Sequence, residues 1–147
     1  AQVIELDSAH ELEHSLEVQL PFLQTLLNDF VLVPLVVGDC SALQVAEVLE
    51  MLWGGNETLI VVSSDLSHFQ SEASARVQDK KTADAILALS PGDIHADDAC
   101  GRNPIRGLLL AARLHQLNPL LLDLRTSADT AGSPERVVGY GAFVFSR

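Results

Sequence analysis

The interpretation of this sequence starts from the stretch Leu59-Ile60-Val61-Val62-Ser63-Ser64-Asp65-Leu66-Ser67-His68-Phe69. Its first half, Leu59–Val62, is an apolar run rich in β-branched residues, which is typical of a strand buried on both faces in the middle of a parallel sheet. Its second half turns polar at once. Because ligands in open α/β sheets bind beyond the carboxyl ends of the strands, the stretch predicts a functional site at this point.

Asp65 and His68 are the two side chains in this stretch that are suited to chemistry. A carboxylate and an imidazole three residues apart can face one cleft, and the pKa of histidine lies near neutrality, which suits proton transfer. A purely structural interpretation is equally open. In that case Ser64 or Asp65 caps the N-terminus of a helix, and His68 lies on the first turn of that helix.

Composition limits the classes of function. The chain has 147 residues, of which 48% are hydrophobic and 20% charged, so we expect a single α/β domain over residues 1–147. The net charge is -11 with only 9 Lys and Arg, which argues against partners such as nucleic acid or an anionic membrane. No apolar run is long enough to span a bilayer. Two cysteines do not make a disulfide framework, so we expect a cytoplasmic protein.

Apolar periodicity and turn residues predict strands that alternate with helices along the chain. This order predicts a layered α/β fold with a largely parallel or mixed central sheet flanked by helices. The sequence opens directly in an apparent strand, so we expect it to begin inside a larger domain. The expected strands are Val3–Leu6, Phe30–Val37, Leu59–Val62, Leu120–Leu124 and Val137–Phe145, and the expected helices span residues 16–27, 41–52, 72–89 and 104–117. Pro21 predicts that the first helix begins late or kinks.

Four motifs, in order over almost the whole chain, resemble those of the Memo family, which is also called AmmeMemoRadiSam system protein B. Each motif is much less specific alone than the set. The motifs are Glu13-His14-Ser15-Leu16-Glu17-Val18-Gln19-Leu20-Pro21-Phe22, Val62-Ser63-Ser64-Asp65-Leu66-Ser67-His68, Cys100-Gly101-Arg102-Asn103-Pro104-Ile105, and Ser127-Ala128-Asp129 followed by Val137-Val138-Gly139-Tyr140-Gly141-Ala142.

The resemblance implies a fold similar to the class III extradiol dioxygenases, without the N-terminal part of that fold. It implies that His14 and Cys100 are metal ligands, with a further His ligand in a Pro-His-Ala-Gly-like motif that this chain lacks. It also implies an acid/base role for His68, with Asp65 beside it. A mixed nitrogen and sulfur ligand set suits iron, copper or zinc, and the site in this chain can also be empty.

Two functions follow from the resemblance. In the first, the protein is a redox enzyme with a mononuclear metal and an unidentified small-molecule substrate. In the second, the same cleft binds a peptide or partner protein without catalysis. Because a chain that begins inside a domain leaves a sheet edge or an apolar face uncovered, we also expect a homo-oligomer.

Overall fold

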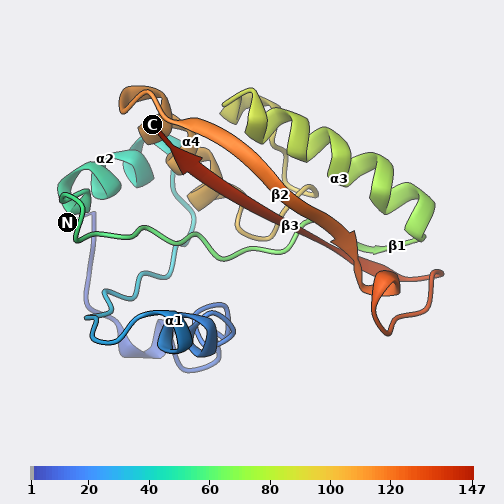
Figure 1. Cartoon of the computed structure of the whole chain (residues 1–147), viewed down its shortest axis with the longest axis horizontal. Helices are drawn as coiled ribbons and strands as arrows, with labels where there is room; N and C mark the ends of the chain where they lie inside the picture. Colours follow the sequence, from blue (N-terminus) through green and yellow to red (C-terminus); the bar gives the residue numbers. More distant parts are fainter. Residues whose placement is uncertain (1) are drawn as a thin grey trace.

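A computed structural model describes residues 2–147 and shows a mixed α/β chain with four α-helices and a small sheet (Figure 1). No helix in this part of the chain combines the length and the apolarity that crossing a membrane requires. The elements are η1 (Asp7–Ala9), α1 (Leu20–Leu26), α2 (Ala42–Leu52), β1 (His68–Gln70), α3 (Glu72–Leu87), η2 (Pro91–Asp93), α4 (Arg102–Leu114), β2 (Asn118–Thr126), η3 (Ser127–Asp129) and β3 (Val137–Ser146).

The sheet differs from the expected largely parallel one, because its three strands are antiparallel and have the order β1-β3-β2. β2 and β3 form the long pair, with Leu120 opposite Val144 and a register shift between Leu121 and Asp123. Only η3 and a short loop separate these two strands, and such a connection suits antiparallel neighbours, since parallel strands need a long crossover. The likeness to the extradiol dioxygenase fold stays a prediction.

The expected central strand Leu59–Val62 is wrong, because the structure assigns no strand to these residues. Its side chains alternate between exposed and inward-facing positions. Leu59 and Val61 are exposed, while Ile60 and Val62 each pack against one of the two apolar clusters of the core. It therefore has the side-chain alternation of a half-buried strand without a ladder. The strands expected at Val3–Leu6 and Phe30–Val37 are absent in the same way. A strand requires a neighbour for its backbone hydrogen bonds, and apolar patterning does not supply one.

The helices agree better with the sequence, because their start signals are local. Ser41 caps α2 in a reciprocal capping box with Gln44, and Ser71 caps α3. α1 begins late, at Leu20, with Pro21 in its first turn, as the position of this proline predicted.

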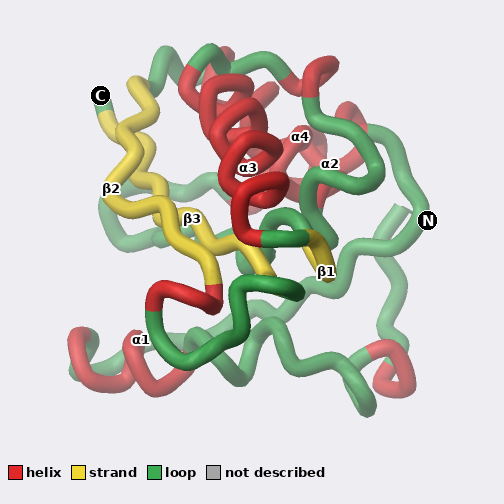
Figure 2. Tube along the Cα trace, turned by 90° about the vertical axis from the view of Figure 1, so that its right-hand side faces the viewer, coloured by secondary structure: helices red, strands yellow, loops and turns green. Residues whose placement is uncertain are grey.

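Two apolar clusters make up the described core, and α4 contributes to both. The first lies between α3, α4 and the sheet and includes Leu66, Ile86 and Leu109. The second lies between α2 and α4 and includes Val45, Leu49 and Ala111. Figure 2 shows α3 beside the strands, with α2 and α4 behind it. α4 therefore links the part of the chain that contains α2 to the part that contains the sheet.

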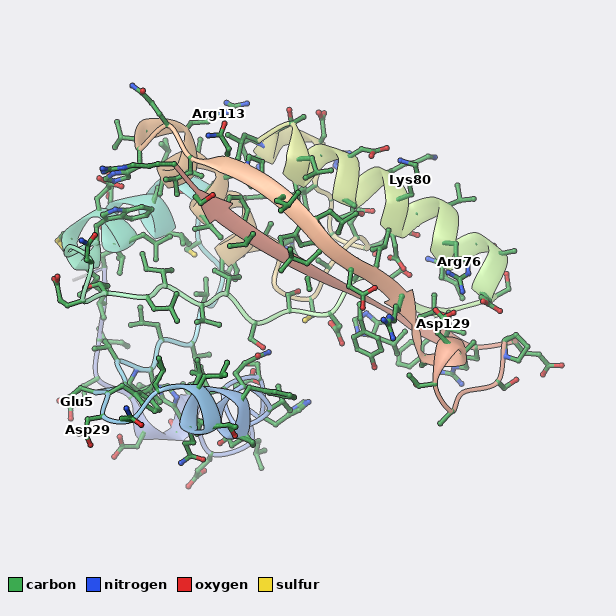
Figure 3. The ribbon with its side chains drawn as sticks, viewed as in Figure 1. Glu5, Asp29, Arg76, Lys80, Arg113 and Asp129 are labelled. Atoms are coloured by element: carbon green, nitrogen blue, oxygen red, sulfur yellow. The ribbon has the colours of Figure 1, made fainter. Side chains whose placement is uncertain are left out.

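An ion-pair network joins the N-terminal end of α3 to the loop between β2 and β3. Arg76 lies 2.6 Å from Asp129 of η3 and 2.7 Å from Glu72 on its own helix, and Arg76 and Asp129 point toward one another in Figure 3. Backbone hydrogen bonding from Thr126, followed by hydrogen bonding from Arg76, lowers the pKa of Asp129. The network is solvent-accessible, so we assign it a role in local order rather than a large share of the stability.

The N-terminal segment that contains η1 and α1 lies to one side of the helices and sheet in both Figure 1 and Figure 2. Many of its apolar side chains are exposed, and no residue of η1 or α1 is buried. The exposed set in residues 2–36 includes Ile4, Leu12, Phe22, Leu26, Val31 and Val33. This segment therefore adds little to the described core.

Gly107 provides a test of the contact between α2 and α4. A Cβ at this position would collide with Val45 on α2. Overpacking of this kind costs about 1–3 kcal/mol, while alanine returns at most about 1 kcal/mol of helix propensity. We expect Gly107→Ala to lower the free energy of unfolding by about 1 kcal/mol in urea titrations followed by circular dichroism.

Gly92→Ala is the control, because a Cβ there meets nothing within 4 Å and should leave the free energy of unfolding nearly unchanged. Val45→Ala combined with Gly107→Ala should cost less than the sum of the two single changes. A Gly107→Ala variant as stable as the parent would show that the helices are not in close contact here.

Candidate functional site

The Ser64–His68 loop is held against the first residues of β3 by backbone hydrogen bonds. The Leu66 amide donates to the Gly139 carbonyl oxygen, and the Gly139 amide donates to the Ser67 carbonyl oxygen, each at 2.8 Å. His68 begins β1 and pairs with Val138. The helix-cap interpretation of this stretch is therefore wrong, because a strand rather than a helix follows the polar residues and Ser71 caps the next helix.

Asp65 and His68 form the closest functional pair, with 2.7 Å between Oδ2 of Asp65 and Nε2 of His68. Both side chains are partly buried, with 29% and 31% of their surface exposed, so solvent or a small molecule can reach the pair. The carboxylate fixes the orientation of the imidazole ring. The other oxygen, Oδ1 of Asp65, is buried without a hydrogen-bond partner among the described residues.

Cys100 joins this pair through Ser64. The Ser64 hydroxyl oxygen lies 3.6 Å from Sγ of Cys100 and accepts a hydrogen bond from the Gly101 amide at 2.9 Å. A Cβ at Gly101 would collide with Ser64, so glycine permits the close approach of the two chain segments. Residues that are 36 positions apart, Ser64 and Cys100, are thereby brought into one cluster, which we call the Asp65–His68–Cys100 site.

The site favours the neutral form of the cysteine. Desolvation by the surrounding chain raises the pKa of the Cys100 thiol above its ordinary value, and the nearby negative charge of Asp65 acts in the same direction. Cys100 is nonetheless exposed enough to react with solutes. With its pKa raised, this cysteine is a thiol rather than a thiolate at neutral pH.

His14 makes no described hydrogen bond or ion pair with Asp65, His68 or Cys100. Its side chain is 87% exposed, and its nearest acidic partner is its neighbour Glu13, at 3.9 Å. The N-terminal segment does approach the site at another residue, because the Gln19 side-chain amide donates to the Ser63 hydroxyl at 3.0 Å. Ligand roles for His14 and Cys100 stay predictions.

The donor groups do not fit a complete metal centre in this arrangement. Within residues 2–147, no three His, Cys, Asp or Glu side chains gather in a way that could hold a metal ion. One thiol from Cys100 is fewer ligands than a protein usually provides to a bound iron, copper or zinc ion.

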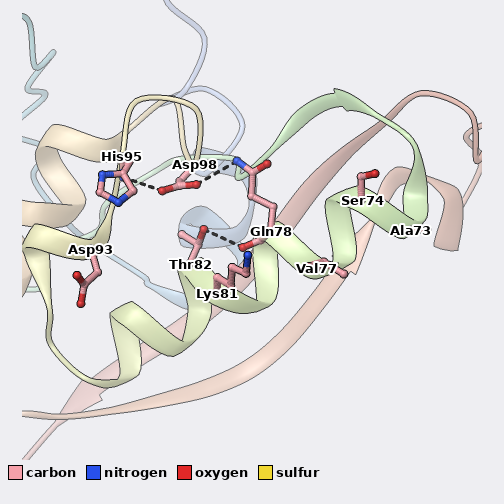
Figure 4. Close-up of a pocket in the computed structure, with 9 residues that line it drawn as sticks. All are labelled: Ala73, Ser74, Val77, Gln78, Lys81, Thr82, Asp93, His95 and Asp98. Atoms are coloured by element: carbon pink, nitrogen blue, oxygen red, sulfur yellow. Dashed lines mark hydrogen bonds between the residues drawn. The ribbon is translucent and has the colours of Figure 1, made fainter.

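A hollow that the sequence did not indicate lies between α3 and the loop at residues 93–98 (Figure 4). Its polar groups largely satisfy one another. Asp98 accepts hydrogen bonds from the His95 backbone amide at 2.7 Å and from the Gln78 side chain at 3.0 Å. His95 itself is exposed, so no polar side chain described in this hollow is positioned to bind a ligand.

Comparisons with known proteins agree over nearly the whole chain. The family model described as "Memo-like protein" matches residues 2–144. A "MEMO1 family protein" of Nitrosopumilus maritimus is 32% identical over 157 aligned residues, which cover 99% of this chain and 57% of the relative. The corresponding protein of Methanococcoides burtonii is 36% identical, with 97% and 59% covered. The chain thus spans less than two thirds of the length of these relatives.

The raised thiol pKa leads to a test by alkylation. In a Cys40→Ala background, the rate of reaction of Cys100 with iodoacetamide should rise with pH around a midpoint above that of a free cysteine peptide. Asp65→Asn should lower this midpoint because the negative charge is removed. Part of the increase in the pKa of the Cys100 thiol should remain, since its desolvation is unchanged.

Asp97→Asn is the matched control, since Asp97 is an exposed carboxylate outside the site and should not affect the midpoint. A midpoint that stays the same or rises in Asp65→Asn would contradict an electrostatic effect of Asp65 on the Cys100 thiol.

Proposed function

The chain belongs to the Memo-like protein family, and on that premise we propose that Asp65, His68 and Cys100 supply the proton-transfer part of an active site for an unidentified small molecule. The observation that carries this proposal is the 2.7 Å contact between Asp65 and His68 in a partly exposed position. A general base must be reachable and correctly oriented, and this pair meets both requirements.

The contact determines which ring nitrogen does the chemistry. When the imidazole is neutral, Nε2–H donates to the Asp65 carboxylate, and Nδ1 is then the nitrogen that can accept a proton from a bound molecule. The carboxylate also stabilises the imidazolium that forms. Cys100, held nearby as a neutral thiol, can donate a hydrogen bond to the same molecule.

The redox form of the proposal adds a mononuclear iron, copper or zinc ion with Cys100 and His14 as ligands. Thiolate sulfur and imidazole nitrogen suit these metals, and a bound metal would supply one-electron or Lewis-acid chemistry. It would also require donors beyond those that residues 2–147 gather around Cys100. The proton-transfer proposal is independent of that requirement.

A depletion assay tests the proton-transfer proposal. The purified chain is incubated with a mixture of small metabolites, and consumption is followed by mass spectrometry. We expect at least one compound to be consumed by the parent chain, with the rate falling by about 10²–10⁴-fold in His68→Gln, which is the usual contribution of general acid–base catalysis. Asp65→Asn should also slow consumption, because the ring loses its orienting partner.

His95→Gln is the control for the loss of an exposed histidine outside the site, and its rate should match that of the parent chain. Consumption that persists unchanged in His68→Gln would rule out proton transfer by this residue.

A second candidate function, a binding module for a peptide or partner protein, is favoured by a separate observation. Val31 and Leu59 are 92% and 66% exposed and lie in extended segments that have no ladder among the described residues. Extended apolar segments with unpaired backbone groups are the surfaces to which another polypeptide adds by strand pairing. In a pure sample, the available partner is a second copy of the chain.

Light scattering tests this candidate. We expect the mean mass of the chain to rise with concentration, and the combined change Val31→Ser and Leu59→Ser to shift it toward the monomer because apolar contact area is lost. Val77→Ser is the matched control: Val77 is also apolar and 59% exposed, but it lies on α3. A clean monomer at high concentration would remove the support for this candidate.

A further inference from the structure

We propose that Asp79, on α3, is a positioning residue that holds His68 in its orientation toward Asp65. The proposal rests on the proposed proton-transfer function of the site. Asp79 belongs to none of the motifs that indicated the site, and it touches neither Asp65 nor His68 in any described hydrogen bond. It acts through Ser67, the residue immediately before His68.

Asp79 lies in the core, where a carboxylate is costly. Only 1% of its surface is exposed, and its Oδ1 accepts a hydrogen bond from the Ser67 amide at 2.9 Å. Its other oxygen, Oδ2, is buried without a partner among the described residues. Burying a carboxylate with an unsatisfied oxygen destabilises a fold, so stability alone is a poor explanation for an acidic residue at this position.

The carboxylate completes a clamp around the Ser67 peptide groups. From one side the Asp79 carboxylate accepts from the Ser67 amide, and from the other side the Gly139 amide donates to the Ser67 carbonyl oxygen. Ser67 itself is fully buried. Both neighbouring peptide groups of Ser67 are thus fixed, and the direction in which the chain enters His68 is fixed with them.

Gly139 packs closely against the Asp79 carboxylate. A Cβ built at this position would overlap the Asp79 carboxylate, and its backbone does not lie in the left-handed region that favours glycine. The absence of a side chain at position 139 therefore serves to admit the carboxylate. Asp79, Ser67 and Gly139 come from α3, the Ser64–His68 loop and β3, so three elements meet where His68 is oriented.

The 2.7 Å contact between Asp65 and His68 depends on the turn between them. Asp65 precedes Ser67 by two residues and His68 follows it directly, so the placement of the Ser67 peptide sets the position of His68 relative to Asp65. Without Asp79, the Ser67 amide would be a buried donor without an acceptor, and the loop would have to open to satisfy it.

The experiment records NMR spectra of the full chain, with two readouts. The first is the ring nitrogen and proton resonances of His68, which report the contact with Asp65. The second is hydrogen exchange at the Ser67 amide. We expect Asp79→Ala to move the His68 ring resonances in the same direction as Asp65→Asn, and to speed exchange at Ser67 by about tenfold, the usual effect of losing a buried hydrogen bond.

Asp79→Asn should restore both readouts close to those of the parent, because the asparagine oxygen can still accept from the Ser67 amide. Asp84→Ala is the matched control: Asp84 is on the same helix but on the surface, paired with Lys80, and its loss should leave His68 unchanged. Gly139→Ala displaces the carboxylate without removing it and should reproduce the effect of Asp79→Ala on His68.

Unchanged His68 resonances in Asp79→Ala would overturn the proposal, and Gly139→Ala decides in its place if Asp79→Ala does not fold. If neither variant folds, the parent chain decides, since rapid exchange at its Ser67 amide would show that the clamp does not exist and protection would support it.

The Asp65→Asn variant distinguishes failure of the proposed proton-transfer function from failure of the role proposed for Asp79. If it leaves His68 unchanged, the proposed function fails. If it alters His68 while Asp79→Ala does not, only the role of Asp79 fails.

Discussion

The structure depends most on the double pairing of β3. Along most of its length β3 pairs with β2, and its first residues also hold β1 and the loop that leads into it. The exchange of two backbone hydrogen bonds between Gly139 and the Leu66–Ser67 segment places His68 beside the sheet. Because α3 and α4 pack on the same core, the position of this one strand determines where both Asp65 and Cys100 lie.

Local signals in the sequence were enough for the helices and for β2 and β3, which contain the expected strands Leu120–Leu124 and Val137–Phe145, but not for the pairing of the sheet. The Ser41 and Ser71 caps can be identified because each acts within four residues of itself. The Leu59–Val62 run has the composition of a central strand, but a strand is defined by its neighbours, and composition contains no information about them. The inward packing of Ile60 and Val62, alternating with exposed neighbours, is the part of that expectation that the structure retains.

The residues of the site were likewise only partly predictable from the sequence. The resemblance of motifs identified Asp65, His68 and Cys100, and the structure pairs Asp65 with His68 and places Cys100 beside Ser64. His14, identified by the same reasoning, lies in the exposed N-terminal segment with its side chain largely open to solvent. Asp79 gave no signal at all, because an aspartate in the polar sequence Gln78-Asp79-Lys80-Lys81 is expected on a helix surface. Only packing against Gly139 shows that it is buried.

The span of α4 has a mechanical consequence. Its N-cap, Gly101, directly follows Cys100 and touches Ser64, while its middle residue Gly107 lies against α2. One short helix thus has two close-packing points, one beside the thiol and one on α2. The placement of Cys100 beside Ser64 is therefore tied to the packing of two helices that carry none of the proposed reactive groups.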